Sequence, residues 1–150
     1  MSEILEKIIK EKISADHLLY VSLKYTKTCD VIYNLLLRWR KMISTSIDAL
    51  LRHAKVKGRI KEVPENNVRK IEQMRITFKR DKNFKEVIKF YEMLRKIESL
   101  RTERIGEFRK NVSLKISYKG EIVEVNLEKL KEYAEMLEKF ISTTKQFLLS

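Results

Sequence analysis

The chain of 150 residues fits one domain, and a chain of this length buries roughly 68–70% of the surface of its unfolded state. With three Gly, one Pro, one Cys and 43% hydrophobic residues, it is neither collagen-like nor disordered, and an internal disulfide is excluded. The net charge is +12, and residues 31–80 hold 13 Lys and Arg against four Asp and Glu, which favours a polyanionic partner. Charged residues interrupt every apolar run, so we expect no membrane span. The first residues lack the basic and apolar segments of a secretory signal, and we expect one cytoplasmic domain over residues 1–150.

The first third of the chain has helical spacing of its apolar residues. Ser2 can cap a short amphipathic helix that ends near Ser14. From residue 15 to 56, apolar residues recur at three- and four-residue steps without Gly or Pro. This stretch is either one very long helix or two helices broken around residues 26–30, where β-branched residues weaken the helix and Asp30 can cap a second one.

The middle of the chain adds two more predicted helices. Gly58 is the natural end of the preceding helix, and Pro64 with Glu65 suits the first turn of the next, which reaches about Arg80. Residues 81–83 are a short connection, and they precede a long helix predicted over residues 84–110.

The apolar period then changes from helical to alternating. Residues 112–125 alternate around a Lys119-Gly120 turn, which predicts a β-hairpin. Asn126 can cap a last helix whose apolar positions continue to Leu148. The predicted fold is therefore mainly all-α: an antiparallel bundle of four or five helices with one hairpin at about 112–125 before the last helix.

The helix predicted over residues 84–110 carries more apolar positions than one face needs. Phe90, Met93, Ile97 and Leu100 extend the arc that a neighbouring helix would cover. Because a second subunit can bury such an excess, we expect a homodimer formed through helix faces.

Motifs for cofactor and metal chemistry are missing from the sequence. Glycines at 58, 106 and 120 alone exclude phosphate-binding and dinucleotide-binding loops. Two histidines and one cysteine match no zinc spacing, so we expect no metal and no cofactor. Cys29 falls on an apolar stripe and indicates a structural role, and His17 indicates a surface or capping role.

Charged residues on the arc of the same predicted helix form a candidate polar cleft. Glu98 and Arg101 have the spacing of an ion pair along a helix, and the alternative is that this edge of the arc faces solvent. His53 near a helix end is explained by the helix dipole or, alternatively, by contact with an anion. The candidate residues are Glu98, Arg101, Arg104, Arg109 and His53, with Arg95 at the edge of the site.

The stretch Ile47-Asp48-Ala49-Leu50-Leu51-Arg52-His53-Ala54-Lys55-Val56-Lys57-Gly58 resembles the second core helix of HEPN domains, which are small antiparallel helical bundles. Many HEPN domains are RNases that use an Arg followed four to six residues later by His. Neither His17 nor His53 follows an Arg at that spacing. The resemblance therefore implies an inactive or divergent member that binds RNA, nucleotide or a partner protein.

These observations favour a non-enzymatic binding module for RNA or another polyanion. The candidate binding residues are Arg38, Arg40, Lys55, Lys57, Arg59, Lys61, Arg69, Arg75, Lys79 and Arg80. Trp39 is either a base-stacking residue or a core residue. One alternative is a homo-oligomeric structural protein. The other is a divergent, metal-independent RNase in which Arg101, Arg104 or Arg109 contacts phosphate and Glu98, Tyr91 or His53 is the base. A thermophile surface would explain the many charges but not their sign.

Overall fold

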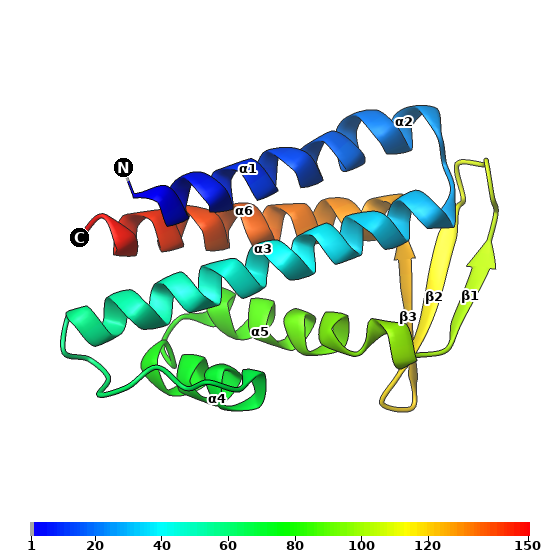
Figure 1. Cartoon of the computed structure of the whole chain (residues 1–150). Helices are drawn as coiled ribbons and strands as arrows, with labels where there is room; N and C mark the ends of the chain where they lie inside the picture. The colour runs from blue at the N-terminus through cyan, green and yellow to red at the C-terminus, as the bar shows by residue number, and fades with distance from the viewer. Residues whose placement is uncertain (1) are drawn as a thin grey trace.

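The computed structural model describes residues 2–150 as four long helical segments with a small antiparallel sheet at one end (Figure 1). In chain order the elements are α1 (Glu3–His17), a π-helical stretch (Leu18–Ser22), α2 (Leu23–Tyr25), α3 (Cys29–Val56), α4 (Asn67–Thr77), α5 (Lys82–Arg95), a 3₁₀ turn (Ile97–Ser99), β1 (Thr102–Ile105), β2 (Ser113–Tyr118), β3 (Glu121–Asn126) and α6 (Leu127–Leu148). The prediction of a mainly helical fold is confirmed, with three strands in place of a single hairpin. Within residues 2–150 no helix combines the length and the hydropathy that crossing a bilayer requires.

The first helical segment is longer than the sequence indicated. The Ser2 hydroxyl accepts a hydrogen bond from the Leu5 N–H at 3.3 Å, as expected of a cap. The helix does not end near Ser14, because α1 continues through the π-helical stretch into α2 and forms one rod (Figure 1). Of the two alternatives for residues 15–56, the structure shows two helices with a break between Tyr25 and Cys29, and Thr28 rather than Asp30 caps α3.

The long helix α3 lies at the centre of the fold. It packs against α1, α4, α5, α6 and β2, so its buried residues occupy several sides. Trp39 is 3% exposed and makes edge contacts with Phe90 and Tyr133, which places it in the core. Gly58 ends the helix in the left-handed conformation, and the Arg59 N–H donates to the Ala54 carbonyl at 2.9 Å.

The short helix α4 begins three residues later than predicted. Pro64 and Glu65 lie in the preceding loop, and Asn67 is the first helical residue. The Asn66 side chain accepts a hydrogen bond from the Arg69 N–H at 2.9 Å and so caps the helix. This cap sets the residue at which α4 begins.

The prediction of a helix over residues 84–110 is wrong beyond Arg95. The chain passes through the 3₁₀ turn, and residues 102–105 pair with β2 as an antiparallel strand in which Thr102 faces Ile116. The apolar spacing wrongly extended the helix because Ile97, which lies after the end of α5, is still buried. A third strand also completes a sheet that would be marginal as an isolated hairpin.

The predicted hairpin and the last helix are confirmed. Lys119 and Gly120 both have positive φ, as the tight turn between β2 and β3 requires. Ile116 and Val125 are fully buried, so one face of the sheet packs on the helices. Asn126 accepts from the Lys129 N–H at 2.8 Å and caps α6.

The apolar excess that predicted a homodimer is satisfied within one chain. Phe90, Met93 and Ile97 are 6%, 4% and 1% exposed, and Leu100 is partly buried against the core. Phe90 stacks on Tyr133 of α6 with ring centroids 4.2 Å apart. The apolar positions on which the homodimer prediction was based are therefore covered within one chain and do not support it.

Candidate anion-binding cleft

A polar cleft of about 540 Å³ lies where α3, the start of α4 and the end of α5 meet. Its lining residues are Leu37, Arg40, Lys41, Ser44, Thr45, Asn67, Tyr91 and Arg95. Three of them are cations, and no Asp or Glu of the described residues belongs to the lining. The cleft therefore presents positive charge and hydrogen-bond donors together.

Helical spacing explains how the sequence builds this cleft. On α3, Lys41 and Ser44 are three residues apart, and on α5, Tyr91 and Arg95 are four apart, so each pair lies on one helix face. Asn67 is the first residue of α4, where the helix dipole has its positive end. All three helices thus add groups that favour an anion.

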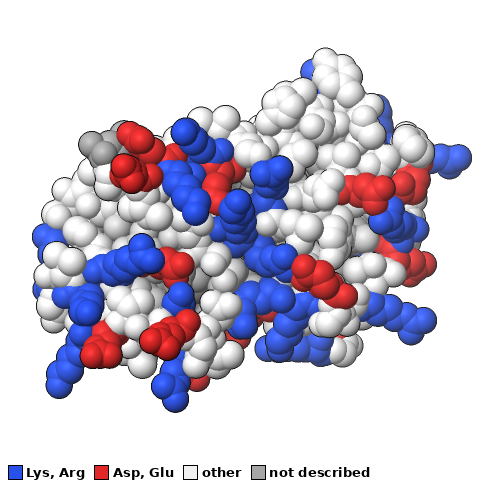
Figure 2. Space-filling model, in the orientation of Figure 1, with Lys and Arg blue, Asp and Glu red and all other residues white. Residues whose placement is uncertain are grey.

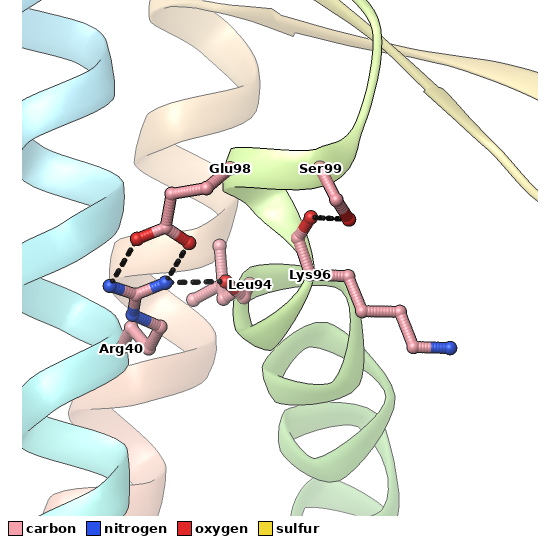
Figure 3. A network of polar contacts seen from close by, with 5 residues as sticks. All are labelled: Arg40, Leu94, Lys96, Glu98 and Ser99. Carbon is pink, nitrogen blue, oxygen red and sulfur yellow. Dashed lines mark hydrogen bonds and ion pairs between the residues drawn. The ribbon is translucent and has the colours of Figure 1, made fainter.

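Arg40 is held in one position by the turn that follows α5 (Figure 3). Its Nη1 and Nη2 donate to the two carboxylate oxygens of Glu98 at 2.5 and 2.9 Å, and Nη1 also donates to the Leu94 carbonyl at 3.2 Å. The Lys96 side chain points away from this pair, and its carbonyl accepts from the Ser99 hydroxyl at 2.8 Å (Figure 3). The guanidinium is therefore oriented before any ligand binds.

The same pairing decides where net charge remains. The hydrogen bond between the two groups raises the pKa of Arg40 and lowers the pKa of Glu98, so both stay ionised and offset each other. Lys41 and Arg95 form no ion pair with a carboxylate of residues 2–150. These two residues supply the unbalanced charge of the cleft.

The residues of the predicted polar cleft do not come together. Glu98 binds Arg40 rather than Arg101. The helix predicted to carry both Glu98 and Arg101 ends at Arg95, so their helical spacing does not bring them together. Arg104 pairs with Asp30 at 2.6 Å beside the start of α3. His53 packs edge-on against Phe147, with ring centroids 5.0 Å apart, near the far end of α3.

Arg101 and Arg109 are exposed at the sheet end of the molecule. The Arg101 carbonyl accepts from the Ser117 N–H at 2.9 Å, which continues the pairing of β1 with β2. Neither side chain has an ion-pair partner among residues 2–150.

The ten predicted polyanion-binding residues divide into three groups. Arg38 and Arg40 lie on α3 near the cleft, and Arg69 and Arg75 lie on α4. Lys55, Lys57, Arg59, Lys61, Lys79 and Arg80 lie at the end of α3 and in the two connections on either side of α4. Arg75 pairs with Glu92, which leaves the other residues of the α4 and connection groups without an ion pair to residues 2–150.

Arg59 ties the two connections together. Its Nη2 donates to the Thr77 carbonyl at 2.9 Å, and its guanidinium lies 5.3 and 5.5 Å from the rings of Phe78 and Phe147. Lys79 and Arg80 line the same surface hollow of about 330 Å³. This group is a second cationic region, separate from the cleft.

Cys29 has a structural position. Its thiol donates to the Ser113 carbonyl at 3.3 Å, and its N–H donates to the Glu107 carboxylate at 2.8 Å. Burial, reinforced by Glu107, raises the pKa of the thiol to about 11. The cysteine joins the start of α3 to the sheet.

No family model, curated protein or solved structure matches this chain. Within residues 2–150, no three His, Cys, Asp or Glu side chains are grouped so that they could hold a metal ion. Sequence reasoning missed Lys41, Ser44 and Asn67 as site residues. The three- and four-residue spacing around Arg40 could have indicated the first two, whereas Asn67 joins the cleft only through tertiary packing.

Proposed function

We propose that this chain is a cytoplasmic, non-enzymatic module that binds RNA or another polyanion, and that the cleft holds phosphate groups. The observation that carries the proposal is the grouping of Arg40, Lys41 and Arg95 in one cleft whose described lining has no carboxylate. Such a cluster gains affinity for a polyanion by releasing condensed counterions. Ser44 and Asn67 add neutral donors for phosphate oxygens.

Cations continue beyond the cleft along α3. Arg38 lies three residues before Lys41, so both lie on one side of the helix, and both are exposed. In Figure 2, Lys and Arg atoms cross the middle of the face that α3 and α5 share. A strand of several phosphates can therefore follow the helix on either side of the cleft.

The composition of the cleft favours binding over hydrolysis. Its described lining contains no His, Cys, Asp or Glu that could act as an ordinary general base. Glu98 is adjacent, but Arg40 lowers its pKa, which makes this carboxylate a weaker base. Arg101, Arg104 and Arg109, which a divergent RNase would use, lie outside the lining. The HEPN resemblance stays a prediction.

Two double variants with the same loss of charge test the proposal. Lys41→Ala with Arg95→Ala removes the unbalanced cations of the cleft, and Lys7→Ala with Lys10→Ala removes two exposed cations from α1. In fluorescence anisotropy with a labelled oligouridine, we expect the cleft variant to bind about tenfold more weakly or worse, and the α1 variant to bind within about twofold of wild type. Equal losses in both variants, or no binding by the wild type, would contradict the proposal.

A further inference from the structure

A second pocket, of about 270 Å³, lies where α2 and the preceding π-helical stretch meet α6. Leu19, Tyr20, Leu23 and Leu127 form its apolar part, and Lys24, Lys27 and Lys131 complete the lining. No carboxylate of the described residues lines this pocket. An apolar hollow surrounded by ammonium groups suits a ligand that is itself apolar and carries negative charge close by.

Two aromatic rings beside this pocket are turned to solvent. Tyr25 is 79% exposed and Phe108 is 75% exposed, whereas Trp39 is buried. The Phe108 N–H donates to the Lys27 carbonyl at 2.7 Å, so the loop carrying Phe108 touches the segment just after Tyr25. In Figure 2, a protrusion with few charged atoms occupies the upper right, where α2 lies in Figure 1.

The loop that presents Phe108 is strained and firmly held. Phe108 has φ +66°, a left-handed conformation that is strained for a bulky residue. Before Phe108 in the chain, the Glu107 carboxylate accepts from the Cys29 N–H at 2.8 Å, and Arg104 pairs with Asp30. The fold therefore holds the backbone of a residue whose aromatic ring is exposed and contributes little to the core, as expected for a residue that contacts a ligand.

We propose that this aromatic end, formed by Tyr20, Tyr25, Phe108 and the three lysines of the pocket, binds unpaired bases of a single-stranded nucleic acid. Bases stack on exposed aromatic rings, and neighbouring lysines neutralise the phosphates between them. A duplex keeps its base faces covered, so it cannot use these rings. The inference rests on the proposed function and adds the substrate class to it.

The charge of this surface argues against a protein partner and against a second copy of this chain. Lysine is depleted at protein–protein interfaces, whereas three lysines line this pocket. In a two-fold dimer through the same surface, the lysines of the two copies would oppose each other. A nucleic acid supplies the apolar ring and the compensating anion in one ligand.

The aromatic end and the cleft can bind the same nucleic-acid strand. Glu107, the chain neighbour of Phe108, accepts from the Cys29 N–H at the start of α3, and Lys41 of the cleft follows 12 residues along that helix. This separation corresponds to about 18 Å of helix. Arg38 lies between them on the exposed side, so a strand that stacks at one end can reach the cations of the other.

The test compares a ligand that has bases with one that has none. A labelled oligouridine of about 12 nucleotides is long enough to contact both regions, and inorganic polyphosphate supplies charge alone. In Tyr25→Ala with Phe108→Gly, the glycine removes the ring and accepts the left-handed backbone. We expect oligouridine to bind this variant about tenfold more weakly or worse, while polyphosphate and duplex RNA bind within about twofold of wild type.

Matched variants control for exposure and folding. Ile122→Ala removes a side chain that is 62% exposed near the opposite end of β3, and it should leave oligouridine binding unchanged. Phe108→Tyr keeps an aromatic ring and should retain binding. Circular dichroism melts of all variants verify folding.

Three results would overturn the inference. If Tyr25→Ala with Phe108→Gly binds oligouridine like wild type while the cleft variant binds it weakly, the stacking site is wrong and the cleft stands. If neither oligouridine nor polyphosphate binds wild type, both proposals fail. If light scattering shows a wild-type dimer that this aromatic variant dissociates, the surface contacts a second copy instead.

Discussion

Two carboxylates hold groups that are distant in the sequence. Glu98 accepts from Arg40 and Glu107 accepts from Cys29, across 58 and 78 residues respectively. These hydrogen bonds lower the pKa of both carboxylates from their ordinary value of 4.5. A carboxylate whose folded pKa is lowered stabilises the fold above its unfolded pKa, and this stabilisation disappears as the pH falls through the folded pKa.

Glu98→Gln should therefore destabilise the protein in a pH-dependent way. At pH 7 we expect the melting temperature to fall by about 2 °C, because one largely exposed ion pair is lost. Well below pH 4.5, where Glu98 is protonated in wild type, the two proteins should melt together. Differential scanning fluorimetry across this range measures the difference. A difference that is the same at acidic and neutral pH would contradict the assigned ion pair.

Cys29 should be inert in the folded protein. A thiol with a pKa of about 11 holds roughly one part in a thousand of reactive thiolate at pH 8. We expect iodoacetamide to modify Cys29 rapidly in guanidinium chloride and very slowly in buffer, as followed by intact mass. Equal rates in the two conditions would show that the thiol is neither buried nor held by its partners.

At the scale of elements, local signals predicted helix ends better than helix lengths. Ser2, Gly58 and Asn126 act through contacts within a few residues, so their roles can be read from the sequence. The strand β1 cannot be read in this way, because three of its four residues are exposed and its pairing with β2 is not local. Apolar spacing alone therefore extended α5 across it.

Only some residues of the candidate site were predicted, because contacts between distant parts of the chain cannot be read from local sequence signals. Arg40 and Glu98 were each selected from the sequence, but in different sets, since only the folded chain brings α3 beside the turn after α5. Lys41 differs from other exposed lysines only in its neighbours. The aromatic end was not predicted, because exposure of Tyr25 and Phe108 depends on tertiary structure.

Two glycines of the sheet offer a test of the loop that ends β1. Gly106 and Gly120 have φ +67° and +78°, so Ala at either position costs about 1–2 kcal/mol of backbone strain. At Gly106 the added Cβ would also lie 2.9 Å from the Asn111 carbonyl oxygen, whereas at Gly120 it would meet open space. Urea unfolding should show a loss of stability that is larger for Gly106→Ala by about 1 kcal/mol or more. Equal losses would contradict the close packing of this loop.

At the scale of the whole molecule, the net charge of +12 is divided among separate regions. The cleft, the connections around α4 and the aromatic end each present cations. Ion pairs such as Arg75 with Glu92 offset part of the remaining positive charge. A polyanion is thus expected to bind through a few defined contacts, and the number of these contacts can be measured from the effect of salt.

The dependence of oligouridine affinity on salt tests the central claim most directly. Each phosphate neutralised on a single strand adds about 0.7 to the slope of log affinity against log salt concentration. Wild type, Lys41→Ala with Arg95→Ala, and Lys7→Ala with Lys10→Ala are titrated from low to physiological salt. We predict that the cleft variant flattens the slope by about 1.4 units and that the α1 variant stays parallel to wild type. Identical slopes for all three proteins would contradict the assignment of the cleft as the phosphate-binding site.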